Sequence, residues 1–211
     1  MFCSECGQQA RGKFCSHCGS PVETAGQNEI ATENVLYIAD WTNEVRHDLI
    51  VRVPEVRAEI DRHARLAKKS ISGEQFLEIC EKIVPGGLPL AKLASVIQPL
   101  YSSWGINTGK QRTAEFYEPV GRIIVRVLCS LAKHGQTIRK IQQASDGCAF
   151  EAVLPSDIWS LEGDLLVTIH RQGTKSIVEA VTKIPGQWMD WGKSNRCLDQ
   201  LLGDLGYRAA A

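Results

Sequence analysis

Apolar residues recur at helical spacing through residues 35–134, which predicts a helical region there. A first helix is expected from Pro54, because proline suits the first position of a helix. A second is expected after Ser72, since a serine followed three residues later by a glutamine is a capping-box pattern. Two more helices are expected, one from Pro89 and one over residues 113–134, where the apolar residues form a continuous stripe.

After Gly135 the apolar residues alternate with polar ones, which is typical of strands. Asp146 and Gly147 stand between two such stretches, and this dipeptide is a strong signal for a hairpin turn. A closing helix with leucines along one side is expected over residues 195–205. The strands are expected over residues 137–145, 148–154, 165–169 and 176–184.

This order of elements predicts an α+β fold. We expect residues 35–211 to form one α+β domain, with its helical region at 35–134 and an antiparallel sheet with the closing helix at 135–211. Residues 23–34 show no apolar period and predict a linker. A small cysteine-rich module precedes the linker over residues 1–22.

The 211-residue chain has eight cysteines, and four of them stand near its beginning as two Cys-x-x-Cys pairs. This spacing lets one tight turn aim two sulfurs at a single ion. Two such turns make a tetrahedral sulfur site, which favours one structural Zn²⁺ with no open position for water or substrate. Iron in the same site and a pair of redox dithiols are the alternatives. The expected ligands are Cys3, Cys6, Cys15 and Cys18.

Phe2 and Phe14 precede the two cysteine pairs, and Gly7 and Gly19 follow them. With these matches and all four cysteines, residues 1–22 resemble the N-terminal zinc ribbon found on many bacterial and archaeal proteins. A peptide this short builds no core of its own, so we expect bound metal to supply most of its folding free energy.

Charge gives little support to a nucleic-acid partner. Basic and acidic residues number 24 each, so the formal net charge is zero, and overall charge alone would not hold nucleic acid. Residues 46–69 carry a local surplus of basic residues. Because acidic residues are interspersed among them, a solvated helix face is expected rather than a phosphate-binding surface.

The sequence has no stretch long and apolar enough for a transmembrane helix. Its first twenty residues carry charged side chains in place of the apolar core of a secretory signal. We therefore expect a cytoplasmic protein, whose thiols stay reduced and available to metal.

No catalytic motif is evident in the sequence. It contains no complete phosphate loop, no Gly-x-Ser-x-Gly elbow, no His-Glu-x-x-His pair and no dinucleotide-binding glycine pattern. Four cysteines remain outside the N-terminal pairs, Cys80, Cys129, Cys148 and Cys197. They are isolated in the sequence and are expected to be buried thiols of the core. We therefore expect a protein that is not an enzyme.

A group of aromatic and charged residues precedes and begins the closing helix. Two tryptophans three positions apart, with charges beside them, are a candidate ligand or partner surface. Core packing of the tryptophans, with Ser194 as the helix cap, is the alternative. The residues of this candidate surface are Trp188, Asp190, Trp191, Lys193 and Arg196.

The stretch TKIPGQWMDWGKSNRCLDQLLGDL has the order of last strand, short connection and long helix. In this it resembles the end of the START/Bet v 1-like helix-grip fold, within a likeness that extends over residues 147–205. The resemblance implies an apolar cavity that holds lipids or other hydrophobic ligands.

Together these patterns predict a non-enzymatic zinc-ribbon protein whose α+β domain binds a protein or a ligand. A hydrophobic-ligand (lipid) carrier or sensor is the first alternative. A regulator associated with nucleic acid is the second.

Overall fold

The computed structural model describes residues 6, 8, 16–18, 40–67, 72–83, 92, 110–156, 161–184 and 191–207 of the chain. The chain divides into two units, Met1–Leu36 and Tyr37–Ala211. Only five residues of the first unit are described, so the helices and strands below all belong to the second.

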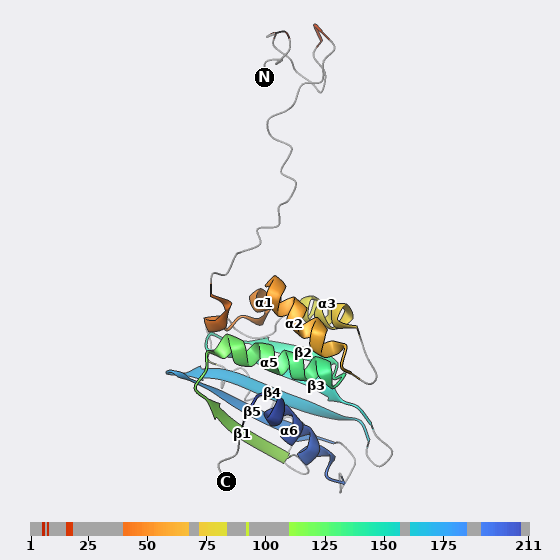
Figure 1. Cartoon of the computed structure of the whole chain (residues 1–211), viewed down its shortest axis with the longest axis vertical. Helices are drawn as coiled ribbons and strands as arrows, with labels where there is room; N and C mark the ends of the chain where they lie inside the picture. Colours follow the sequence, from red (N-terminus) through yellow and green to blue (C-terminus); the bar gives the residue numbers. More distant parts are fainter. Residues whose placement is uncertain are drawn as a thin grey trace. The chain divides into compact units, whose positions relative to one another are not determined.

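A five-stranded antiparallel sheet is the base of the second unit (Figure 1). Its spatial order is β1-β5-β4-β3-β2, so the four later strands form a meander and β1 adds to its β5 edge. The predicted hairpin is confirmed, because β2 pairs with β3 and Gln143 lies opposite Cys148. The strands are β1 (Lys110–Phe116), β2 (Ile138–Gln143), β3 (Gly147–Leu154), β4 (Gly163–Gln172) and β5 (Lys175–Lys183).

A bulge in β2 accounts for a departure from strict alternation. Ile138 and Ile141 are three residues apart, yet both are buried and both belong to the core. The register shifts between Ile138 and Lys140, so Ile138 pairs with Ala152 and Ile141 with Phe150. An extra residue at a bulge turns the following side chains to the other face, and here it brings both isoleucines to the core.

Helix α5 (Val120–Lys133) connects β1 with β2 and lies in the middle of the unit (Figure 1). It contacts β4 and β5 on one side, and η1 (Trp41–Asn43), α1 (His47–Ile50) and α2 (Pro54–Ala64) pack on it as well. Apolar side chains therefore surround most of it. Those with no exposed surface are Ile123, Ile124, Val127, Leu128 and Leu131.

The helix predicted over residues 113–134 is wrong at its beginning, because residues 110–116 form strand β1. Ala114 and Phe116 are buried while Thr113 and Glu115 are exposed, which is the alternation of a strand. Phe116 fits the apolar stripe of a helix as well, because it stands four residues before Val120, the first residue of α5. Pro119 separates the two elements as the N-cap of α5.

The other predicted helices in the described part of the chain are confirmed. Helix α2 has Pro54 at its start, and its Val56, Ile60 and Ala64 are buried. Helix α3 (Gly73–Lys82) has the capping box, in which the Gln75 N–H donates to Ser72 Oγ at 3.1 Å and the Ser72 N–H donates to Gln75 Oε1 at 3.0 Å. The closing helix is α6 (Lys193–Asp204). The helix expected from Pro89 lies outside the described residues.

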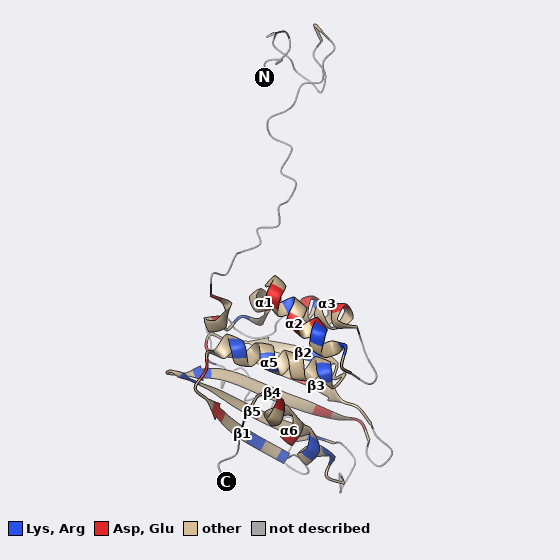
Figure 2. Cartoon of the chain, in the orientation of Figure 1, with Lys and Arg blue, Asp and Glu red and all other residues tan. Residues whose placement is uncertain are grey.

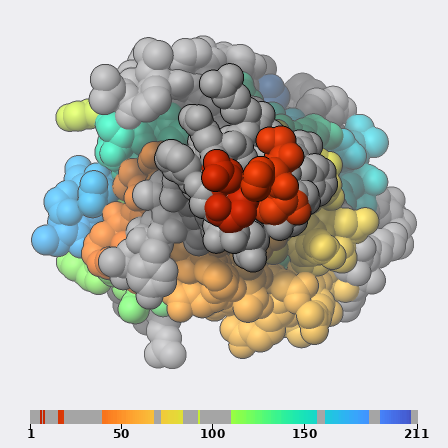
Figure 3. All heavy atoms as spheres, turned by 90° about the horizontal axis from the view of Figure 1, so that it is seen from above, coloured from red at the N-terminus to blue at the C-terminus, as the bar shows by residue number. Residues whose placement is uncertain are grey.

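The helices form two layers over one face of the sheet. Helix α6 contacts α5, β1 and β5, so it covers the same face as α5. Helix α3 packs on α2, and the two carry interspersed basic and acidic residues (Figure 2). They adjoin at the surface in the space-filling view (Figure 3). The longest helix of the described part, α5, has 14 residues, too few to cross the hydrocarbon core of a bilayer.

Gly121, in the first turn of α5, allows η1 to approach closely. A Cβ at this position would overlap the backbone of Trp41 and Thr42. We expect Gly121→Ala to reduce the free energy of unfolding by about 1–3 kcal/mol, as overpacking against a backbone does. Urea unfolding of the full chain measures this difference.

Gly203→Ala is the matched control for that substitution. Gly203 is also helical, but nothing lies within 4 Å of the position that its Cβ would take. Its replacement should leave the stability unchanged or raise it by about 0.5–1 kcal/mol, because alanine is the better helix former. Equal effects of the two substitutions would show that the close approach at Gly121 has no energetic consequence.

Candidate functional site

The N-terminal cysteine module is only partly described. Cys6 is half-buried and Cys18 is exposed, while Cys3 and Cys15 lie outside the described residues. The zinc ribbon thus stays a prediction from the sequence.

The candidate surface before the closing helix is described at three of its five residues, and these differ in exposure. Trp191 is 60% exposed and its backbone has a left-handed φ of 48°. The exposed Arg196 donates from Nη1 to the Trp191 carbonyl at 2.9 Å. Lys193 is buried, and its Nζ donates to the Leu161 carbonyl at 2.7 Å, which removes it from any exposed patch. Trp188 and Asp190 lie outside the described residues.

The cap expected at Ser194 is wrong. Helix α6 has Gly192 as its N-cap, with a left-handed φ of 76°, and Ser194 lies buried inside the first turn. A glycine takes this left-handed backbone conformation without steric cost, which suits Gly192 to the position before the helix.

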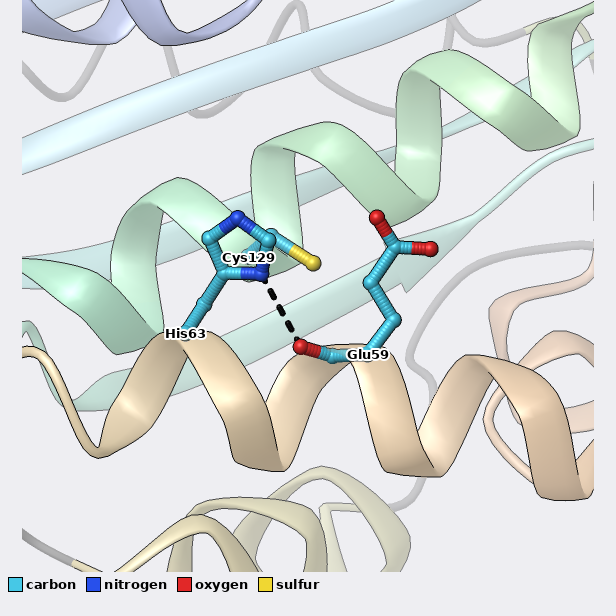
Figure 4. Close-up of side chains that lie close together, drawn as sticks. All are labelled: Glu59, His63 and Cys129. Carbon is cyan, nitrogen blue, oxygen red and sulfur yellow. Dashed lines mark hydrogen bonds between the residues drawn. The ribbon is translucent and has the colours of Figure 1, made fainter.

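The described residues contain one group able to hold a metal ion, in the seam between α2 and α5. Glu59 and His63 stand one helical turn apart on α2, and Cys129 faces them from α5 (Figure 4). A carboxylate oxygen, an imidazole nitrogen and the thiol sulfur all lie within 4.8 Å of one another. Figure 4 shows the three side chains converging on the space between the two helices.

The hydrogen bonding of His63 determines which ring nitrogen is available. Nδ1 lies 2.9 Å from the Glu59 backbone carbonyl, which only accepts hydrogen bonds, so Nδ1 carries the proton. In the neutral ring, Nε2 then keeps the lone pair. A metal-binding histidine commonly donates its second N–H to a backbone carbonyl in this way.

Cys129 and Glu59 differ in their exposure to water. Cys129 is only 5% exposed, and burial, followed by the charge of Glu59, raises the pKa of its thiol to about 12. The Glu59 side chain is 46% exposed, and Arg62 lies 3.5 Å from its carboxylate. The cluster thus has a buried sulfur at its base and a carboxylate open to solvent.

This cluster was not predicted from the sequence. The predicted burial of Cys129 is confirmed, but Cys129 is not isolated, because Glu59 and His63 lie close to its sulfur. The spacing of Glu59 and His63, four residues apart on a helix, was a usable signal because it places both on one face. Cys129 stands far along the chain, and only the packing of α5 against α2 brings it there.

Asp204 is the centre of a polar group that joins α5 to α6. Lys133 Nζ donates to its Oδ1 at 2.6 Å, and Ser130 Oγ donates to its Oδ2 at 2.9 Å. His134 Nε2 lies 2.8 Å from the same Oδ2. Because the serine hydroxyl bonds to the carboxylate and not to the histidine, this group is not arranged as a nucleophile with its base.

Gln143 organises a second buried group, at the start of the helical layer. Its Oε1 accepts from Nδ1 of the fully buried His47 at 3.2 Å, and its Nε2 donates to the carbonyls of Val45, Ala144 and Gly147 at 3.0 Å each. Burial lowers the pKa of His47, so the ring is neutral at physiological pH. This arrangement joins the segment before α1 to the hairpin of β2 and β3.

Comparisons with protein-family models, with curated proteins and with solved structures find no match to this chain.

The Asp204 group should make stability depend on pH in acid. Burial raises the pKa of the Asp204 carboxyl, but hydrogen bonds from Lys133, Ser130 and His134 lower it by more than burial raises it. The pKa in the folded chain therefore lies below the ordinary 3.8. The stabilisation is present above the ordinary pKa and is lost as the pH falls through the folded one. Asp204→Asn should reduce the free energy of unfolding at pH 7 by about 1–3 kcal/mol and flatten its fall in acid.

Asp199→Asn is the matched control, on the same helix. Its carboxylate is 67% exposed and lies 3.9 Å from Arg112, so its loss should change the stability by less than about 1 kcal/mol. Chemical unfolding between pH 3 and pH 7 compares the two variants. An acid limb that is as steep in Asp204→Asn as in the unmodified chain would contradict the assignment.

Proposed function

We propose that this chain is a non-enzymatic binding protein, with a structural zinc module at its N-terminus and an α+β unit that binds a protein or an apolar ligand. The two Cys-x-x-Cys pairs, Cys3 with Cys6 and Cys15 with Cys18, are the observation that carries the zinc assignment. Four thiolates fill a tetrahedral shell, so the zinc would stabilise the module rather than act on a substrate. The requirement for reduced thiols favours the cytoplasm as its location.

The chemistry of the second unit supports binding over catalysis. Burial raises the pKa of Cys80 to about 12, and it raises the pKa values of Cys148 and Cys197 as well. Thiols with raised pKa values are protonated at neutral pH and are poor nucleophiles. Ser130, as described above, bonds to a carboxylate rather than to a base.

A carrier or sensor of an apolar ligand is the second candidate. Helix α6 follows the last strand along the chain, which is the order of elements that the helix-grip resemblance implies. It packs on β1 and β5. Native mass spectrometry of the purified chain tests it. A co-purified lipid would favour the carrier, and a ligand-free chain that binds no added fatty acid would contradict it.

A nucleic-acid partner has less support, because the basic surplus of residues 46–69 is largely paired in its described part. Three of the arginines have acidic partners on the same or the neighbouring helix. These ion pairs are Arg57 with Glu81, Arg62 with Glu59 and Arg65 with Asp61. Binding that weakens steeply with salt would favour this alternative over the others.

Metal analysis tests the zinc module. The full chain, purified without chelator and dialysed against metal-free buffer, should retain one zinc ion. The double variant Cys3→Ser/Cys15→Ser should lose it, because two of four ligands are removed. Cys148→Ser/Cys197→Ser is the matched control, which removes two buried thiols and should keep the zinc. A chain that holds no zinc, or that has a disulfide in its place, would contradict the proposal.

A further inference from the structure

The seam between α2 and α5 is apolar along most of its length. Helix α2 buries Val56, Ile60 and Ala64, and α5 buries nearly all of its residues. Glu59, His63 and Cys129 interrupt this seam with three groups that can each bind a metal ion. Apolar side chains would be sufficient to pack the two helices together. A carboxylate, an imidazole and a thiol that converge there share a different property, the ability to bind a metal ion.

The separations are close to those of a zinc shell. Zinc bonds of about 2.0 Å to nitrogen or oxygen and about 2.3 Å to sulfur place tetrahedral ligands roughly 3.3–3.8 Å apart. One nitrogen of His63, the Cys129 sulfur and a Glu59 carboxylate oxygen lie within 4.8 Å of one another, so a contraction of at most about 1–1.5 Å would close the shell. Glu59 can supply that movement, because its side chain is 46% exposed and its ion pair with Arg62 is long, at 3.5 Å.

The ligand set also suits zinc chemically. Thiolate, imidazole and carboxylate are all ligands that zinc accepts in proteins. One thiolate and one carboxylate neutralise the charge of the ion. The hydrogen bond from His63 Nδ1 to the Glu59 carbonyl can be kept while Nε2 binds, and it would orient the ring.

We propose that Glu59, His63 and Cys129 form a second metal site, which takes Zn²⁺ through three protein ligands and leaves the fourth position to water. On binding, the Cys129 S–H bond is replaced by a sulfur–zinc bond and the proton passes to the buffer. The ion would join α2 to α5, so its binding would stabilise the contact between the two helical layers. This site is independent of the N-terminal cysteine module.

Calorimetric titration of the full chain tests the proposal. The starting protein is dialysed as for the metal analysis, so the N-terminal module keeps its own zinc, and Zn²⁺ is then added. One further equivalent should bind and should raise the melting temperature. Cys129→Ser, Glu59→Gln and His63→Gln should each weaken this second binding at least about tenfold.

Two variants control for other effects of these substitutions. Cys80→Ser replaces another buried thiol, on α3, and Glu74→Gln replaces an exposed carboxylate on the same helix. Both should bind the further zinc as the unmodified chain does. If Cys129→Ser fails to fold, the two substitutions on α2 still test the site, because Glu59 and His63 are not fully buried.

Other outcomes would overturn the site. A chain that takes up no zinc beyond that of the N-terminal module has no second site. Binding that persists undiminished in all three variants belongs to residues elsewhere.

Cadmium NMR separates the two proposals, since a mixed sulfur, nitrogen and oxygen shell resonates apart from a shell of four sulfurs. Loss of only the four-sulfur signal in Cys3→Ser/Cys15→Ser would leave the second site standing.

Discussion

Helix α5 is buried along most of its length, and the rest of the second unit packs around it. A helix buried on one side needs only a sheet beneath it, but 11 of the 14 residues of α5 are buried, and its polar residues are confined to one stripe. The sheet covers one side, and η1, α1 and α2 cover another. The short N-terminal helices are therefore part of the core, since without them the second apolar side of α5 would face solvent.

Polar side chains beside the buried part of α5 form hydrogen bonds, because an unpaired polar group out of contact with water is destabilising. Arg126, on α5, donates to both carboxylate oxygens of Glu118 at 2.7 Å and to the Leu205 carbonyl at 3.1 Å. Asp204, next to Leu205 at the C-terminal end of α6, accepts from Lys133 and Ser130 and lies within hydrogen-bond distance of His134. These bonds have directions, whereas apolar contacts have none, so they determine how α6 lies along α5.

The elements that sequence analysis predicted best are those whose signal is local. The capping box at Ser72 and the proline at the start of α2 depend on residues within a single turn, and the hairpin of β2 and β3 on a dipeptide. Strand β1 was missed because its partner, β5, is distant in sequence. Phe116 fits the apolar stripe of α5 as well as the alternation of a strand, and only pairing with Ser176 decides between them.

Separation along the sequence also limited which residues of the candidate sites could be predicted. Two of the three residues in the α2–α5 cluster share a helical face and could have been paired from the sequence, but Cys129 could not. The surface before α6 was proposed from composition alone. Its Lys193 turned inward because the Leu161 carbonyl, from the segment before β4, accepts the ammonium there.

The position of β1 has a consequence for how the chain folds. Strands β2 to β5 each pair with a neighbour in sequence, so their loops are short and close rapidly. Strand β1 pairs with β5 across α5 and the whole meander, and its Glu115 meets Lys175, 60 positions later. Closing so long a loop has a higher entropic cost, which the burial of α5 must offset. We therefore expect the meander to form first, and the docking of β1 to be coupled to that of α5 in one late cooperative step.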